Sequence, residues 1–231
     1  MKPFTFKNFE ISQHQNVFRV GTDGVVLGVI ASVDNAQNIL EVGTGTGFIS
    51  LMLAQRNPQA EILALDINSH AVQMASQNFA NSPFSERLKV VKQNFNDFLW
   101  NNSFDLIISN PPYFEESTSE KDKIARQTIE LNFKDLIEKS VMLLNEGGAF
   151  SVIIPFESGE EFIDICFENK LYLKRKVNVF GIKKNKPKRL VLEFSKHNQK
   201  VISEDFIIEK SPRQYSDQYL ELTKEFHVFN K

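Results

Sequence analysis

The chain has 231 residues, with 27 Lys and Arg against 29 Asp and Glu, which gives a formal net charge of −2. Hydrophobic residues make up 42% and charged residues 24%, an ordinary globular composition that excludes a disordered or fibrous protein. The chain has one cysteine, Cys166, so a disulfide framework and a cysteine-cluster zinc site are both excluded.

The length predicts a single domain over residues 1–231, with a monomer as the favoured state. The first residues (MKPFTFKN) have no long apolar stretch behind their lysines and do not resemble a signal peptide. No window of the sequence approaches the roughly 18 apolar residues that a membrane span needs. The histidines are scattered, without the spacing of metal ligands. We therefore expect a cytoplasmic protein without a membrane span and without a metal site.

Strands and helices alternate in the middle of the chain, and each is predicted from its hydrophobic pattern. Ser69 and Ser158 are expected helix N-caps, the latter in a capping box with Glu161. This alternation predicts right-handed crossovers and a parallel sheet covered by helices on both faces. The predicted strands span residues 38–42, 61–66, 88–93, 104–109 and 149–154, and the predicted helices span residues 48–55, 69–81 and 132–144.

A different pattern begins after residue 170. Residues 171–179 and 189–194 are predicted to form two longer strands, joined by a polar, basic connection with no helix between them. Such strands pair antiparallel, and we expect the pair at one edge of the sheet. Residues 215–225 predict a terminal helix. The predicted fold class is α/β, with a mostly parallel seven-stranded sheet and a basic hairpin in residues 38–231, preceded by an N-terminal segment over residues 1–37.

Three glycines follow the first predicted strand, in the sequence EVGTGTGFI at residues 41–49. Gly43, Gly45 and Gly47 let the backbone turn tightly and approach a ligand closely. A dinucleotide-binding fingerprint needs its third glycine at residue 48, which is Phe in this chain. The spacing G-x-G-x-G is instead typical of S-adenosylmethionine sites.

Acidic rather than basic residues accompany this glycine loop. Glu41 lies just before it, and Asp66 ends the second strand, where an acid can accept hydrogen bonds from ribose hydroxyls. No basic residue lies between positions 39 and 55, although a pyrophosphate would favour nearby cations. A sulfonium cofactor carries no phosphate and tolerates acids, so the loop favours S-adenosylmethionine over a dinucleotide. A glycine-rich turn that binds nothing is the alternative.

The sequence Asn110-Pro111-Pro112-Tyr113 follows the fourth predicted strand directly. The two prolines fix φ and stiffen the turn at the carboxyl end of the strand, where open α/β sheets bind ligands. The Asn110 amide oxygen and the Pro111 carbonyl are then two acceptors that can hold one NH₂ group for methylation. Tyr113 can stack on a planar substrate. A loop built only from turn-favouring residues is the alternative interpretation.

With these motifs in place, the sequence resembles the Rossmann-like class I S-adenosylmethionine-dependent methyltransferases, and most closely the tRNA1(Val) (adenine(37)-N6)-methyltransferase family. The resemblance covers essentially the whole chain. It implies transfer of a methyl group from S-adenosylmethionine, leaving S-adenosylhomocysteine, to N6 of an adenine in tRNA, with adenine 37 of tRNA1(Val) as the expected target. The stretches that carry it are residues 9–13 (FEISQ), 19–28 (RVGTDGVVLG), 110–114 (NPPYF) and 187–194 (PKRLVLEF).

The resemblance also implies roles for individual residues. Many relatives have Asp where Asn94 stands, so Asn96 or Asp97 are alternatives for the contact with the cofactor adenine. The implied catalytic turn is Asn110, Pro111, Pro112 and Tyr113. In the implied cofactor site, Glu41, Gly43, Gly45 and Gly47 border the methionine part, Thr22 and Asp23 close its end, Asp66 holds the ribose, and Asn94 and Phe95 flank the adenine.

Positive charge is concentrated late in the chain, where no acid lies between Glu168 and Glu193. Phosphate contacts supply much of nucleic-acid affinity, so this stretch is the expected footprint of tRNA. Sequence-specific RNA recognition usually targets unstacked loop bases, which fits an adenine of the anticodon loop. A surface hairpin whose charges only maintain solubility is the alternative. The expected RNA contacts are Lys183, Lys184, Lys186, Lys188 and Arg189.

Other substrates and one non-catalytic role stay open at this point. Methylation of a glutamine side-chain amide in a protein presents the same NH₂ group, although fewer than forty residues precede the first strand and leave little room for a recognition domain. Methylation of DNA or of another RNA is a further alternative. A non-catalytic scaffold would not need to retain Asn110. Residues 114–131 are expected to form a lid that orders when RNA binds.

Overall fold

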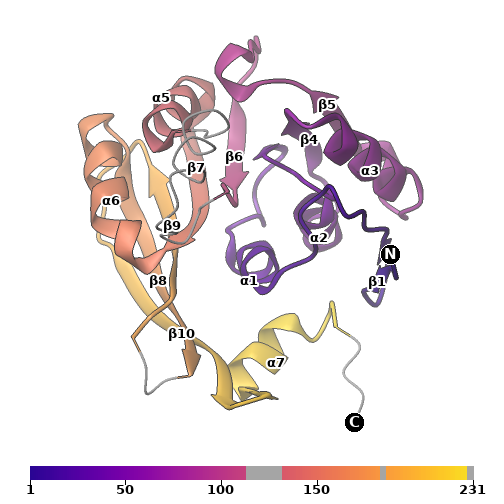
Figure 1. Cartoon of the computed structure of the whole chain (residues 1–231). Helices are drawn as coiled ribbons and strands as arrows, with labels where there is room; N and C mark the ends of the chain where they lie inside the picture. The colour runs from indigo at the N-terminus through magenta and orange to yellow at the C-terminus, as the bar shows by residue number, and fades with distance from the viewer. Residues whose placement is uncertain (113–131, 183–185, 228–231) are drawn as a thin grey trace, which may run out of the picture.

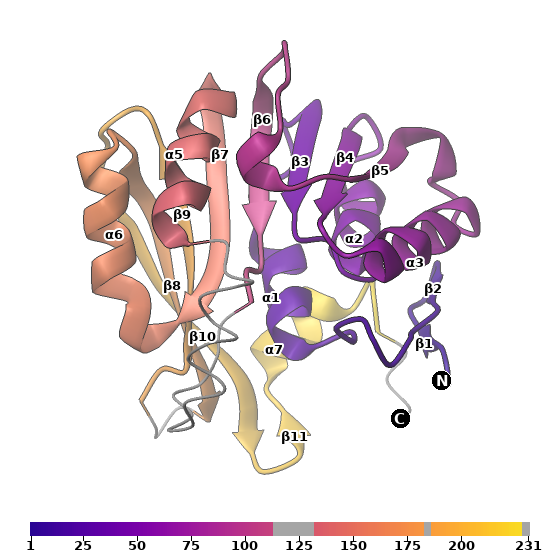
Figure 2. The ribbon, with the colours of Figure 1, turned by 45° about the horizontal axis from the view of Figure 1, so that its top comes forward.

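The computed structural model describes residues 1–112, 132–182 and 186–227. Tyr113, Lys183, Lys184 and the lid expected over residues 114–131 lie outside the described residues. A central sheet with helices on both of its faces dominates the arrangement (Figures 1 and 2). The α/β fold class expected from the alternating pattern is therefore confirmed.

In the described part of the chain, nine strands form the main sheet, in the order β11-β10-β8-β9-β7-β6-β3-β4-β5, and two more form a small N-terminal hairpin. The sheet strands are β3 (Asn38–Val42), β4 (Glu61–Asp66), β5 (Leu88–Lys92), β6 (Phe104–Ser109), β7 (Leu144–Pro155), β8 (Tyr172–Ile182), β9 (Arg189–Ser195), β10 (Ile202–Ser211) and β11 (Gln214–Tyr215). The hairpin strands are β1 (Phe4–Thr5) and β2 (Glu10–Ile11).

The described helices lie in the connections between strands, except α7, which follows the last strand. They are α1 (Thr22–Ile30), α2 (Phe48–Arg56), α3 (Ser69–Ala80), α5 (Phe133–Leu143), α6 (Gly159–Glu168) and α7 (Asp217–Thr223), with short 3₁₀ turns η1 (Ser85–Arg87), η2 (Phe95–Asp97) and η3 (Phe156–Ser158).

Two hydrophobic cores lie on opposite faces of the sheet, because successive strand residues point to opposite sides. On β3, Ile39 belongs to the core beneath α1, α2 and α3, whereas Leu40 belongs to the core beneath α5 and α6. The inner strands are buried on both sides, which explains why their sequences are nearly all apolar. Figure 2 shows α5 and α6 against β7 and β9, and α2 and α3 beside β4 and β5.

The sheet is larger at one edge than the sequence predicted. Seven strands were expected, and β10 and β11 extend the sheet beyond β8. The β8–β9 pair is antiparallel as expected, but it does not form the edge, because β9 pairs with β7 and β8 pairs in parallel with β10. Sequence analysis missed β10 because its side chains are mostly polar and only Phe206 is buried, so the strand has no buried apolar run.

The two predicted helix caps differ from the observed ones. Asn68, not Ser69, caps α3, and its side chain accepts a hydrogen bond from the His70 amide at 2.9 Å. Ser158 does precede α6, but its side chain makes no capping hydrogen bond, so the expected capping box is absent there. Its backbone is already helical, continuing from η3, and its hydroxyl therefore does not take the usual N-cap position.

Candidate active site

The carboxyl ends of β3, β4, β5 and β6 meet at one edge of the sheet, where a large cavity opens. The strands β4 and β6 lie on either side of β3, so the strand order reverses at this point of the sheet. Open α/β sheets usually bind ligands in the crevice at such a point. The cavity has a volume of about 1260 Å³. Its lining comes from five segments of chain and three nearby helix residues, namely residues 15–24 without Val20, residues 42–46, 65–68, 93–96 and 109–112, and Phe48, Ile49 and Ala71.

The glycine loop after β3 forms one wall of this cavity. Gly43, Gly45 and Gly47 have φ values of 76°, 57° and 82°, all in the left-handed region that glycine tolerates. A Cβ on Gly43 would meet nothing within 4 Å, whereas one on Gly47 would lie 2.5 Å from Phe79 Cε1. Gly43 therefore leaves open space towards a ligand, and Gly47 lets α2 and α3 pack closely.

Asp66 organises this loop from the end of β4. Its Oδ2 accepts a hydrogen bond from the Gly45 amide at 2.9 Å, and its Oδ1 accepts one from the Asn68 amide at 2.9 Å. The side chain is half-buried and lines the cavity. Since each carboxylate oxygen can accept more than one hydrogen bond, Asp66 retains acceptor capacity for hydroxyl groups of a ligand.

Glu41 supports the glycine loop from the interior of the protein. The sequence analysis expects this residue to border the methionine part of the cofactor. Its side chain is only 1% exposed, and its Oε2 accepts hydrogen bonds from Thr44 Oγ1 at 2.7 Å and from the Ser50 amide at 3.2 Å. Burial, with a smaller contribution from the charge of Asp66, raises the pKa of Glu41 to about 7. Glu41 therefore braces the loop rather than exposing a carboxylate in the cavity.

The Asn110-Pro111-Pro112 turn lies at the end of β6 and lines the same cavity. Ser109, the last residue of the strand, donates from Oγ to the Val42 carbonyl at 2.9 Å and so ties the turn to the start of the glycine loop. Pro111 is buried, Asn110 is half-buried and Pro112 is exposed. The two sequence motifs are thus brought together by neighbouring parallel strands.

Residues after β5 form the wall beside Asp66, and the Gln93 amide donates to the Asp66 carbonyl at 3.0 Å. Asn94, Phe95 and Asn96 all line the cavity, and Asn94 Oδ1 accepts a hydrogen bond from the Asn96 amide at 3.0 Å. Of the three alternatives for the contact with the cofactor adenine, Asn94 and Asn96 are in the described lining, whereas Asp97 is exposed and outside it.

The start of α1 closes the cavity through Thr22 and Asp23. Asp23 Oδ2 accepts a hydrogen bond from Arg189 Nε at 2.9 Å, and both side chains are largely shielded from solvent. The contact with RNA that the sequence analysis expects of Arg189 stays a prediction, and the structure adds a contact with Asp23, a residue of the cavity lining. The sequence contained no signal for this pair, because 166 positions separate the two residues.

The rest of the basic stretch is also partly neutralised. Arg175, in β8, pairs with Glu204 at 2.7 Å and with the fully buried Glu193 at 3.8 Å. Lys186 lies 3.3 Å from Glu157, and Lys188 is exposed. Lys183 and Lys184 lie outside the described residues. Part of the basic stretch therefore forms ion pairs that hold the fold together.

A wall that sequence analysis did not identify comes from residues 15–19, between β2 and α1. Phe18 is 78% exposed although it lines the cavity, and Arg19 beside it is also exposed. An isolated exposed aromatic cannot be recognised from a single sequence, because nothing local distinguishes it from the many phenylalanines of the core.

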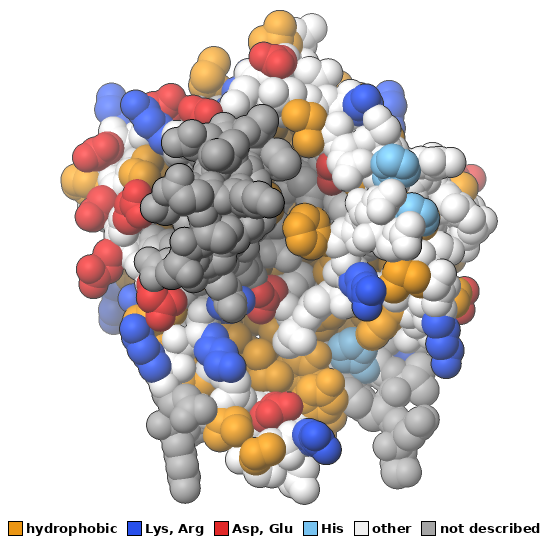
Figure 3. Space-filling view, viewed as in Figure 1, with side chains coloured by type: hydrophobic (Ala, Val, Ile, Leu, Met, Phe, Trp, Pro, Cys, Tyr) orange, Lys and Arg blue, Asp and Glu red, His pale blue; other side chains and the backbone are white. Residues whose placement is uncertain are grey.

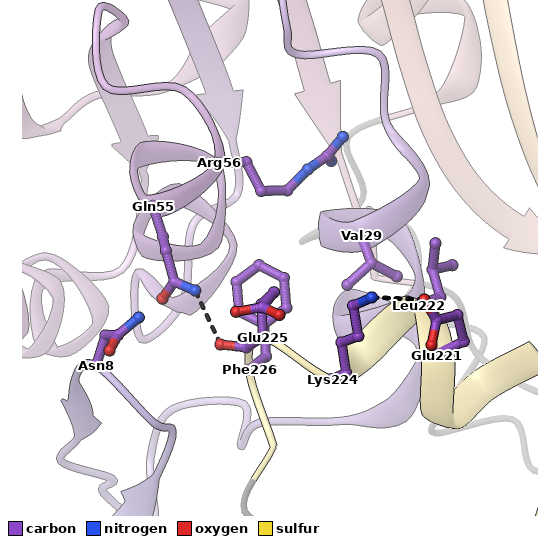
Figure 4. Close-up of a pocket in the computed structure, with 9 residues that line it drawn as sticks. All are labelled: Asn8, Val29, Gln55, Arg56, Glu221, Leu222, Lys224, Glu225 and Phe226. Atoms are coloured by element: carbon purple, nitrogen blue, oxygen red, sulfur yellow. Dashed lines mark hydrogen bonds and ion pairs between the residues drawn. The ribbon is translucent and has the colours of Figure 1, made fainter.

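A smaller cavity of about 570 Å³ lies elsewhere, among α1, α2 and α7 (Figure 4). Gln55 Nε2 donates to the Glu225 carbonyl at 2.9 Å, and Lys224 Nζ lies 2.6 Å from Glu221 Oε1. Arg56 Nη1 donates to the Gly28 carbonyl at 2.8 Å. The first of these contacts joins the segment after α7 to α2, so part of the polar lining of this cavity is engaged in holding the fold together.

Neither a membrane span nor a metal centre is found where the structure is described. Within residues 1–112, 132–182 and 186–227, no helix is long and apolar enough to cross a membrane. In the same residues, no group of three His, Cys, Asp or Glu side chains is arranged to hold a metal ion.

Comparison with known proteins agrees with this geometry. The family model described as "Methyltransferase small domain" matches residues 8–180. A tRNA1(Val) (adenine(37)-N6)-methyltransferase from Flavobacteriaceae bacterium (strain 3519-10) is 53% identical over 230 residues, covering 99% of this chain and 100% of that protein. The protein of the same name from Bacteroides thetaiotaomicron is 40% identical, covering 99% of this chain and 98% of its own length.

Solved structures support the fold at low sequence identity. A predicted O-methyltransferase from Agrobacterium tumefaciens matches with a TM-score of 0.69 at 18% identity, covering 88% of this chain and 96% of its own. A methyltransferase from Pyrococcus furiosus matches with a TM-score of 0.60 at 19% identity, covering 82% and 90%.

Proposed function

We propose a function on the premise that this chain belongs to the tRNA1(Val) (adenine(37)-N6)-methyltransferase family, to which its full-length similarity assigns it. The chain is accordingly a methyltransferase. The proposed reaction transfers a methyl group from S-adenosylmethionine to the exocyclic N6 of an adenine in tRNA. Adenine 37 of tRNA1(Val) is the proposed target, since it is the one that the names of the relatives give.

The observation that carries this proposal is that the glycine loop and the Asn110-Pro111-Pro112 turn line one cavity. The volume of about 1260 Å³ exceeds the roughly 300–1,000 Å³ of typical small-molecule pockets. That volume leaves room for a cofactor and an inserted planar base side by side. A dinucleotide enzyme would not need an amide-bearing proline turn at this position.

The residues of the glycine wall fit S-adenosylmethionine. Gly43 leaves open space where a side chain would otherwise project, and Asp66 retains acceptor capacity for ribose hydroxyls. Four more of the expected residues line the same cavity, namely Asn94, Phe95, Thr22 and Asp23. In this proposal Asn94 and Phe95 would flank the cofactor adenine, and Thr22 and Asp23 would close the methionine end. When bound, the cofactor would supply an electrophilic methyl group on a sulfonium sulfur.

The turn after β6 provides the groups that the amine substrate requires. The Asn110 side-chain oxygen and the Pro111 carbonyl would each accept a hydrogen bond from the N6 amino group, drawing its lone pair out of conjugation with the ring. Tyr113, outside the described residues, would stack on the base. Since the amine can lose its proton after the methyl group has arrived, positioning of the two reactants supplies most of the rate enhancement.

RNA approach is proposed from the side of Lys186 and Lys188 rather than from α6. Acidic side chains gather over α6, whereas acidic and basic side chains are interspersed over the rest of the visible face (Figure 3). An anionic backbone is repelled by the acidic side chains of α6, whereas the exposed Lys188 can attract it. Lys183 and Lys184 lie outside the described residues and remain part of this proposal from the sequence alone.

The test is a methylation assay with labelled S-adenosylmethionine and tRNA that lacks the modification. We expect N6-methyladenosine in the digested tRNA by mass spectrometry, at position 37 of tRNA1(Val) after fragment mapping. The Asn110→Ala variant should retain cofactor affinity and lose most turnover. Asn102→Ala, which changes an exposed amide in the loop before β6, is the matched control. Label that enters a release factor instead of tRNA would favour glutamine methylation and refute the proposal.

A further inference from the structure

Phe18 is an unusual residue of the main cavity, because its side chain is 78% exposed in a chain whose other described aromatic residues mostly fill the core. Single exposed apolar side chains are common and need no explanation. The position of this one is informative, since Phe18 lines the same cavity as the glycine loop and the Asn110 turn.

The backbone that carries Phe18 is held in place on both sides. The Val17 amide donates to the His14 carbonyl at 3.1 Å, and the Val20 amide donates to Gln13 Oε1 at 3.2 Å. The Val17 side chain is buried beneath the segment. The phenyl ring is therefore presented by an anchored loop, with its exposure set by local structure.

The same loop packs against the cofactor wall. The Phe18 carbonyl lies 4.0 Å from the position that a Cβ on Gly45 would occupy, and Asn68 Nδ2 donates to the Asn16 carbonyl at 3.4 Å. Phe18 thus lies at the rim, between the wall assigned to the cofactor and the opening through which a substrate must enter.

The chemistry at this rim suits a nucleotide. The ring offers an exposed π face, and the neighbouring Arg19 offers an exposed cation that can pair with a phosphate. RNA loops are recognised through unstacked bases that pack on aromatic side chains. The proposed function assigns the target adenine to the turn at Asn110, so a base stacked on Phe18 would be a different one.

We propose that Phe18 is a stacking platform for an unpaired nucleobase of the RNA substrate, one that flanks the methylated adenine. This inference rests on the proposed function, because it requires an RNA loop at the cavity. Stacking of a base on an aromatic ring contributes about 1–3 kcal/mol, which corresponds to a roughly 5- to 100-fold change in affinity.

The experiment compares tRNA binding and cofactor binding in the full-length protein. Phe18→Ala should weaken binding of tRNA1(Val) about 5- to 100-fold in the presence of S-adenosylhomocysteine, with cofactor affinity by calorimetry unchanged. Phe18→Tyr should retain most of the affinity, because it keeps the ring. Phe167→Ala is the matched control, since Phe167 is 65% exposed on the acidic helix α6, outside the cavity. It should leave both affinities unchanged.

Fluorescence gives a second readout. The chain has one tryptophan, Trp100, so the double variant Phe18→Trp, Trp100→Phe carries its indole at the rim alone. Addition of tRNA should quench that indole. Unchanged tRNA affinity in Phe18→Ala would overturn the proposal that Phe18 stacks on a nucleobase. A loss of cofactor affinity equal to the loss of tRNA affinity would also overturn it. Wild-type protein that methylates no RNA at all would instead refute the proposed function.

Discussion

The buried carboxyl group of Glu41 makes the stability of the protein depend on pH in a direction that a substitution can test. Burial, and secondarily the charge of Asp66, raises the pKa of Glu41 from 4.5 to about 7, against the effect of hydrogen bonds from Ser50 and Thr44. The native state therefore binds this proton more tightly than the unfolded state. The resulting stability is fully present below about pH 4.5 and is lost as the pH rises through about 7.

The magnitude follows from the difference between the two pKa values. From 4.5 to about 7, at about 1.36 kcal/mol per pH unit, the cost of ionising Glu41 in the fold amounts to roughly 3 kcal/mol. Oε1 of Glu41 has no hydrogen-bond partner in the described structure, so it can carry the proton while Oε2 keeps its donors. This is a large fraction of the roughly 5–15 kcal/mol that stabilises a typical domain.

Glu41→Gln isolates this effect, since the amide is neutral at every pH and keeps an oxygen for the same donors. In urea unfolding followed by circular dichroism, the unfolding free energy of the wild type minus that of the variant should fall by about 2.5 kcal/mol between pH 5 and pH 8. Glu61→Gln, which removes an exposed carboxylate from β4, controls for the loss of one charge. A difference that stays constant or grows with pH would refute the reasoning.

Four further substitutions test other parts of the fold and site. Gly47→Ala should lower the unfolding free energy by about 2–4 kcal/mol in urea titrations, because φ is 82° and the new Cβ would lie 2.5 Å from Phe79 Cε1. Asp23→Asn and Arg189→Gln should each weaken cofactor binding, and their double-mutant cycle in calorimetry should give a coupling of about 1–2 kcal/mol; strict additivity would contradict a functional pair. Glu193→Ala should cost about 3 kcal/mol of stability, since this fully buried carboxylate accepts two hydrogen bonds from Ser32; a melting temperature equal to wild type would contradict that role.

The sequence alone located the inner strands and the two motifs at their ends. β3, β4 and β6 have the bounds that their apolar runs predicted. These strands are buried on both faces, so hydrophobic burial acts on every residue and leaves a continuous signal. Parallel strands end at the same edge of a sheet, so the glycine loop and the Asn110 turn were expected to meet there, and they do.

Strands that are not buried on both faces have no continuous apolar run in the sequence. β10 has one buried residue, Phe206, and pairs in parallel with β8, a partner set by the position of β9 between β8 and β7. The sequence analysis made no prediction for its residues, because strand formation here depends on a neighbouring edge rather than on a local pattern. The count of strands was therefore wrong at that edge while the fold class was right.

The sequence showed where basic residues are concentrated along the chain. Only the tertiary structure showed which partner each basic side chain has. Arg189 was grouped with Lys186 and Lys188 by proximity along the chain, yet it hydrogen-bonds to Asp23 at the start of α1. Electrostatic pairing depends on distance in space, and β9 brings residues from opposite ends of the chain to within 2.9 Å. Phe18 differs from the core phenylalanines for the same reason, since only packing determines which rings stay exposed.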